Sequence, residues 1–100
     1  MIKILISKKN DITESIKITG HAGFSEAGSD IVCASVSSIC ITTVNALIRI
    51  DSECINYEET DGYLKVDIKK HSKVVDLLIE NMISLLTELE KDYKKYIKIN

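Results

Sequence analysis

Two side chains in the first third of the sequence, His21 and Cys33, are of the types that together perform nucleophilic catalysis. A thiolate attacks far better than a thiol, and free cysteine, with a pKa of about 8.5, is mostly protonated at neutral pH. An imidazole within hydrogen-bonding distance can take the thiol proton and later return it to a leaving amine. The pair is therefore compatible with a cysteine hydrolase. Spacing alone does not establish this, because a cysteine in an apolar helix is usually a small buried side chain.

The segment that carries Cys33 is typical of the first turn of a helix. Asp30 is a favourable N-cap, and an apolar segment from Ile31 to about Arg49 follows it, which places Cys33 third in the helix. The unpaired N–H groups and the dipole of a helix N-terminus favour a nearby anion, here a thiolate. We expect the Asp30 carboxylate to face backbone N–H groups and not the sulfur. Ser37, one turn later, could donate a hydrogen bond to the sulfur or to a substrate.

Glycines gather just before this helix. Three of the four in the chain, Gly20, Gly23 and Gly28, lie within nine residues. Because glycine adopts backbone angles that other residues avoid, residues 20–30 are predicted to form a bent, mobile loop. A loop of this kind could close over a substrate.

The two motifs in this region, GHAGF at 20–24 and GSDIVCASVS at 28–37, together resemble the signature of the ribosomal-processing cysteine proteases, the Prp family. The resemblance covers about a third of the chain, and the remainder agrees with the family in length and element order. It implies that His21 is the catalytic histidine and Cys33 the nucleophile. The other motif residues, which it implies as supporting, gating or substrate-binding, are Gly20, Gly23, Gly28, Asp30 and Ser37.

The resemblance also implies a reaction and a substrate. A protease of this family would remove the N-terminal extension of a large-subunit ribosomal protein, cutting after an aromatic pair. His21 would activate Cys33, backbone N–H groups at the helix start would hold the oxyanion, and an acyl-enzyme would be hydrolysed. We expect a cytoplasmic homodimer without cofactor, bound metal, membrane contact or direct nucleic-acid binding.

Two other functions are compatible with the same residues. The first is a non-catalytic, ribosome-associated protein that grips a peptide or RNA with the loop and buries Cys33. The second is a metal site made of His21, Cys33 and a third ligand such as His71, although this spacing matches no closed zinc pattern.

Length and composition set broad limits. One hundred residues predict a single domain, residues 1–100, and the net charge of −2 gives no indication of a polyanion-binding protein. The apolar run at residues 1–7 is too short for a signal peptide, and the apolar segment 31–50 carries enough polar residues to argue against a membrane span. Three widely spaced cysteines predict reduced thiols in a cytoplasm.

Hydrophobic periodicity predicts seven elements. Alternation predicts strands at 2–7 and 14–19, and a hairpin of strands 54–58 and 63–68 around the turn signal Asp61-Gly62. Helical spacing predicts helices at about 31–49 and 73–91, and a short strand ends the chain at 96–99. The first helix is apolar on most of its circumference, so its apolar residues as far as Ile48 are expected to be covered. The second follows Ser72, a favourable N-cap, and carries an apolar stripe that includes Ile79, Met82 and Leu86. The resulting order, β-β-α-β-β-α-β, predicts an α+β domain with a mostly antiparallel sheet and two packed helices. Cys40 and Cys54 are predicted core residues, and His71 a helix-start residue without a partner.

Overall fold

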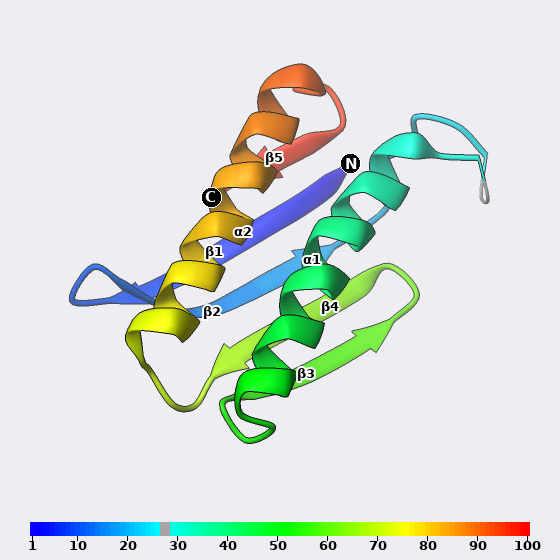
Figure 1. Cartoon of the computed structure of the whole chain (residues 1–100). Coiled ribbons are helices and arrows are strands. Elements are labelled where there is room, and N and C mark those ends of the chain that lie inside the picture. Colours follow the sequence, from blue (N-terminus) through cyan, green and yellow to red (C-terminus); the bar gives the residue numbers. More distant parts are fainter. Residues whose placement is uncertain (27–28) are drawn as a thin grey trace.

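The computed structural model describes residues 1–26 and 29–100 and has the predicted element order (Figure 1). The α+β, single-domain prediction is confirmed. The elements are β1 (Ile2–Lys9), β2 (Ile12–Thr19), α1 (Ile31–Ile50), β3 (Ile55–Thr60), β4 (Tyr63–Ile68), α2 (Lys73–Asp92) and β5 (Ile97–Ile99).

The strands form one sheet in the order β3-β4-β2-β1-β5. All neighbouring pairs are antiparallel except β1 and β5, which run parallel. The turn between β1 and β2 is tighter than predicted, because Lys8 and Lys9 still pair across the hairpin with Thr13 and Ile12. Asn10 and Asp11 alone make the turn, with φ of 53° and 62°, which are angles that a two-residue hairpin loop requires.

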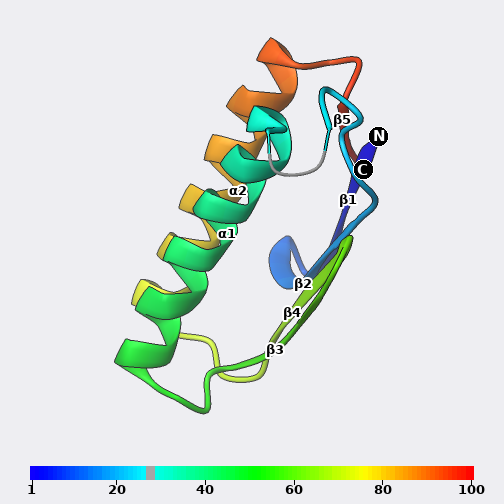
Figure 2. The same ribbon diagram turned by 90° about the vertical axis from the view of Figure 1, so that its right-hand side faces the viewer.

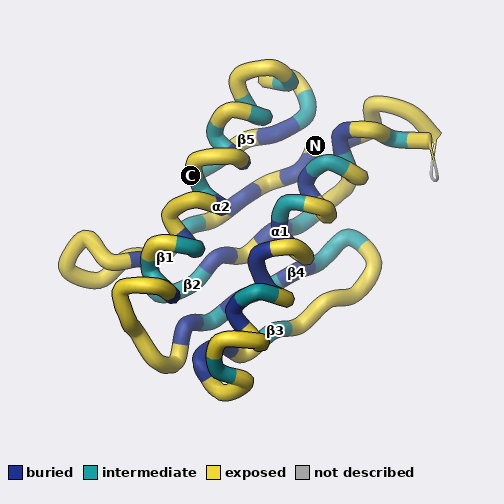
Figure 3. Tube along the Cα trace, in the orientation of Figure 1, coloured by how far each residue is buried: buried dark blue, intermediate teal, exposed yellow. Residues whose placement is uncertain are grey.

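Both helices cover the same face of the sheet, and the opposite face is open (Figure 2). The core lies between the two layers, and buried residues alternate with more exposed ones along the strands (Figure 3). Ile4, Ile16 and Val66 are fully buried there, as the alternation predicted. Burying each such side chain contributes about 1.5–3 kcal/mol to the stability of the domain.

Helix α1 has one buried and one open face. Val36, Cys40 and Leu47 are buried against the sheet and α2. Ile48 was predicted to be covered and is not: it is 41% exposed, because it lies on the open face. Contrary to our expectation from its polar residues, α1 is long and apolar enough to span a membrane by length and composition. The same composition suits the core helix that it forms here.

Helix α2 is capped by Ser72, whose hydroxyl accepts a hydrogen bond from the Val75 N–H at 3.1 Å. Its predicted apolar stripe is confirmed, with Ile79, Met82 and Leu86 almost fully buried. The helix packs on β5 and β2, and the end of β2 and the start of α1 are left to form the site.

Candidate active site

Asp30 ties the glycine-containing loop to the start of α1. Its Oδ1 accepts hydrogen bonds from the N–H groups of Val32 and Cys33, both at 3.0 Å. Its Oδ2 accepts from the N–H groups of Phe24 at 3.0 Å and Ser25 at 3.3 Å. Desolvation acts to raise the pKa of Asp30, but these four hydrogen bonds together lower it. The prediction that this carboxylate caps the helix and faces backbone N–H groups is confirmed.

Cys33 lies in the first turn of α1, as predicted, and is half-buried. Its sulfur accepts a hydrogen bond from the backbone N–H of Ala22 at 3.3 Å. A backbone donor stabilises an anionic sulfur more than a neutral one, because hydrogen bonds to charged acceptors are stronger. The sequence carries no signal for this contact, since any residue type at position 22 except proline has the same N–H.

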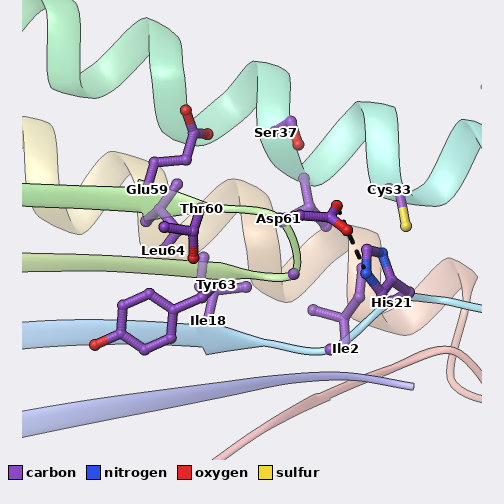
Figure 4. Close-up of a pocket in the computed structure, with 13 residues that line it drawn as sticks. Ile2, Ile18, His21, Cys33, Ser37, Glu59, Thr60, Asp61, Tyr63 and Leu64 are labelled. Carbon is purple, nitrogen blue, oxygen red and sulfur yellow. Dashed lines mark ion pairs between the residues drawn. The ribbon is translucent and has the colours of Figure 1, made fainter.

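His21 follows the end of β2 and is 61% exposed. Its Nε2 lies 3.7 Å from Oδ1 of Asp61, in the turn between β3 and β4. Figure 4 shows the Cys33 sulfur directed to the same end of the site as the imidazole. Among the described residues, no hydrogen bond joins the ring to the sulfur, so the pair is close but not connected. Catalytic hydrogen bonds are often loose in ligand-free enzymes and tighten when a substrate binds.

Gly20 is held by close backbone contacts. Its N–H donates to the carbonyl of Gly62 at 2.9 Å, and its φ is +88°. A Cβ at this position would lie 2.5 Å from the carbonyl oxygen of Met1, so only glycine fits. Gly23 also has a positive φ, and Gly28 lies outside the described residues. The gating role of the loop stays a prediction.

An open pocket of about 440 Å³ connects these residues (Figure 4). His21, Cys33 and Ser37 line it, and the Ser37 hydroxyl makes no hydrogen bond to the sulfur. Apolar side chains from both layers complete the walls, and the β3–β4 hairpin supplies a polar rim. These further lining residues include Ile2, Ile18, Val36, Glu59, Thr60 and Leu64. The sequence does not single them out, because alternation identifies a strand residue as core without indicating which pocket it borders.

The other two thiols cannot compete with Cys33 for a substrate. Burial, with the charge of Glu59 as a smaller cause, raises the pKa of Cys40 to about 12. Burial and the charge of Asp51 raise the pKa of Cys54, whose sulfur also donates to the carbonyl of Leu47 at 3.4 Å. Both side chains are buried, which confirms their predicted place in the core.

His71 lies away from this pocket, and the prediction that it has no partner is wrong. Its Nδ1 lies 2.7 Å from Oδ1 of Asp76, and its Nε2 lies 3.1 Å from Oε2 of Glu14. It is therefore not placed to complete a metal site with His21 and Cys33. Within residues 1–26 and 29–100, no group of three His, Cys, Asp or Glu side chains is arranged to hold a metal ion.

Solved structures with this fold include a protease in complex with peptides. The chain superposes on the essential ribosomal processing protease Prp from Staphylococcus aureus in complex with a covalently linked product peptide, with a TM-score of 0.94 and 28% identity. The match covers 100% of this chain and 98% of that one. The structure of the S. aureus protease with a substrate peptide matches with a TM-score of 0.88 and 27% identity over the same shares.

Sequence relatives agree with the structural match. The chain is 30% identical to the ribosomal processing cysteine protease Prp of S. aureus (strain Mu50), over 99% of this chain and 95% of the relative. It is 34% identical to the protein of the same name in Bacillus subtilis (strain 168), over 99% of this chain and 96% of the relative. The family model described as cysteine protease Prp matches residues 1–98. With the whole domain matched in sequence and in structure, the chain belongs to the Prp family of cysteine proteases.

Proposed function

We propose that this chain is a ribosomal processing endopeptidase in which His21 activates Cys33 as the nucleophile. The observation that carries the proposal is the position of the Cys33 sulfur. It lies at a capped helix start, accepts the Ala22 N–H, and borders the same pocket as the imidazole. The relatives' names supply the reaction class, and the peptide complexes of the S. aureus protease supply the substrate class.

The proposed reaction has two covalent steps. His21 takes the proton from the Cys33 thiol, and the sulfur attacks the carbonyl carbon of the scissile peptide bond. The tetrahedral intermediate collapses to a thioester as His21 gives its proton to the leaving amine. Water, deprotonated by the same imidazole, then hydrolyses the thioester and restores the thiol. The imidazole thus acts in turn as base and acid: the original thiol proton leaves with the amine product, and a proton from the hydrolytic water, passed through His21, restores the thiol.

The oxyanion needs a donor other than the ones expected from the sequence. The N–H groups of Val32 and Cys33 at the helix start already donate to Asp30. The Ala22 N–H lies 3.3 Å from the attacking sulfur, next to the place where the oxyanion forms. We therefore assign the first oxyanion donor to Ala22, whose hydrogen bond would pass from the sulfur to the new oxyanion as the sulfur is consumed.

As substrate we propose the N-terminal extension of a large-subunit ribosomal protein, processed in the cytoplasm. The pocket supports this choice of a peptide with large apolar side chains, because Ile2, Ile18, Val36 and Leu64 line it. Peptide pockets of this kind take their affinity from apolar walls and their orientation from a few polar groups.

A homodimer is part of the same proposal. The outer faces of the two helices expose large apolar side chains, among them Ile48 at 41% and Leu77 at 68%. Exposed apolar side chains of this size are typical of surfaces that contact a partner. Analytical ultracentrifugation of the wild type and a Leu77→Lys variant tests it. A wild type that sediments as a monomer at micromolar concentration contradicts the dimer.

The test of the enzyme is cleavage of a synthetic peptide that spans the extension and the first residues of the mature ribosomal protein. Cys33→Ala should abolish cleavage and keep the fold, because alanine is small and favours helix. Cys54→Ala is the matched control: it removes a thiol outside the pocket and should retain cleavage. Retained cleavage by Cys33→Ala would remove Cys33 as the nucleophile. A native Cys33 that resists iodoacetamide would instead favour the non-catalytic peptide-binding function.

A further inference from the structure

The turn between β3 and β4 contacts His21 from a place forty residues later in the chain. The carbonyl of Gly62 accepts the N–H of Gly20 at 2.9 Å, which fixes the backbone just before the histidine. The Asp61 carboxylate lies 3.7 Å from Nε2 of the ring (Figure 4). The turn therefore contacts both the backbone that precedes His21 and the His21 side chain.

The imidazole ring of His21 lies directly against Gly62. The φ of this glycine is +70°, and a Cβ built on it would lie 2.9 Å from Nε2 of His21. Real Cβ atoms do not approach a neighbour that closely, so any other residue would push the ring away from the turn. The absence of a side chain at position 62 is thus what allows the ring to lie beside Asp61.

A carboxylate on the Nε2 side favours one tautomer of an imidazole. Its charge favours a proton on Nε2, which leaves Nδ1 as the nitrogen with a lone pair for the thiol proton. After Nδ1 takes that proton, the ring is a cation and the carboxylate stabilises it without being protonated itself. The thiol proton moves only from sulfur to Nδ1, and the Nε2 proton stays where it is.

We propose that Asp61 is a positioning residue for His21 and that Gly62, which has no side chain, leaves the space that the ring occupies beside it. This inference rests on the proposed role of His21 as the base of Cys33. Asp61 is 97% exposed and the ring is 61% exposed, so solvent screens the pair. Screened pairs of this kind correspond to a change of about 2- to 5-fold in a rate.

The experiment measures the rate at which iodoacetamide alkylates Cys33 at neutral pH, by mass spectrometry, in the wild type, Asp61→Ala, His21→Ala and the double variant. Iodoacetamide is uncharged, so Asp61 exerts no direct pull on the reagent. Asp61→Ala should lower the rate about 2- to 5-fold. In the His21→Ala background, Asp61→Ala should leave the alkylation rate unchanged, because Asp61 acts through the ring.

The sign of the effect separates this proposal from a general field effect. A negative charge near a thiolate opposes its formation, so removing Asp61 would speed alkylation if it acted on the sulfur directly. Glu58→Ala is the matched control, because it removes an exposed carboxylate three residues earlier in the same hairpin, outside the pocket. It should leave the rate unchanged. Asp61→Asn should give a loss similar to that of Asp61→Ala, because at 3.7 Å the contact acts through charge and the amide carries none.

Peptide cleavage distinguishes this inference from the proposed function. If cleavage needs Cys33 and His21 but Asp61→Ala neither slows alkylation nor lowers kcat, the positioning role is wrong and the protease mechanism stands. If Asp61 and His21 are coupled in alkylation but no ribosomal extension peptide is cleaved, the substrate proposal is wrong and the positioning role stands. An equal loss of rate with and without His21, or with Glu58→Ala, would also overturn the positioning role.

Discussion

His71 joins α2 to the sheet through charge, and replacing it gives a stability change with a predictable pH dependence. Its ring bridges Asp76 in the first turn of α2 and Glu14 in β2, at 2.7 and 3.1 Å. The hydrogen bond to Asp76 and then that to Glu14 raise the pKa of His71, against a smaller effect of desolvation. The protonated ring therefore stabilises the folded state, in which it has both partners.

The free energy follows from exposure and from the sign of the pKa shift. The ring is 31% exposed and its two partners somewhat more, so screening limits each pair to about 0.2–1 kcal/mol, or about 0.5–2 kcal/mol for both. Because the pKa is raised on folding, this stability is fully present below the unfolded value of about 6.5. It is lost as the pH rises through the raised pKa of the folded state.

The assay is urea unfolding of the wild type and His71→Gln at pH 5.5 and at pH 9. The wild type should be more stable than His71→Gln, and this difference in the free energy of unfolding should be about 0.5–2 kcal/mol larger at pH 5.5 than at pH 9. For a domain of this size, that corresponds to about 2–16 °C in Tm. His21→Gln is the control, because the same change at the more exposed histidine should alter stability little at either pH. A gap between wild type and His71→Gln that is equal at both pH values would refute the reasoning.

Three further substitutions test the packing around the site. Gly20→Ala should lower the free energy of unfolding by more than the left-handed backbone strain alone, which is about 1–2 kcal/mol. The reason is that the new Cβ would lie 2.5 Å from the Met1 carbonyl oxygen. Gly23→Ala, with φ of +71° and no atom within 4 Å, should show the strain alone, and equal losses in urea unfolding would contradict the Met1 contact. Phe24→Ala removes edge-to-face contacts with Tyr93 at 5.8 Å and Tyr96 at 5.2 Å, worth about 0.5–1.5 kcal/mol each. Amide hydrogen exchange at residues 24–26 should speed up, and unchanged exchange there would mean that the ring does not anchor the loop.

The elements could be predicted because their signals are local. Alternating isoleucines identified the first two strands, and Asp30 and Ser72 marked the helix starts by their capping chemistry. The strand order could not be predicted in the same way. The parallel pairing of β5 with β1 joins residues more than ninety positions apart, and a three-residue strand carries no information about its neighbour. Ile48 was misplaced for a related reason: helical periodicity does not say how wide a face the sheet and α2 will cover.

The same distinction applies to the site: side chains with local sequence signals could be predicted, and groups brought there by tertiary contacts could not. His21, Cys33 and Asp30 could be identified from residue type, spacing and family resemblance. Asp61 and Gly62 were recognised only as a turn, because nothing in a turn motif indicates which distant side chain lies against it. The Ala22 N–H has no sequence signature at all, although it is the group hydrogen-bonded to the sulfur.

The four hydrogen bonds of Asp30 couple the loop to the reactive helix start. Because Oδ1 accepts from the Val32 and Cys33 N–H groups while Oδ2 accepts from those of Phe24 and Ser25, any movement of the loop would change the environment of the helix start. The same carboxylate withholds two donors that the oxyanion would otherwise use. We therefore expect oxyanion stabilisation to come from the loop, because Ala22 is the loop residue whose N–H already reaches the sulfur. In the proposed mechanism, substrate binding, loop position and activation of Cys33 would be linked through this one backbone segment.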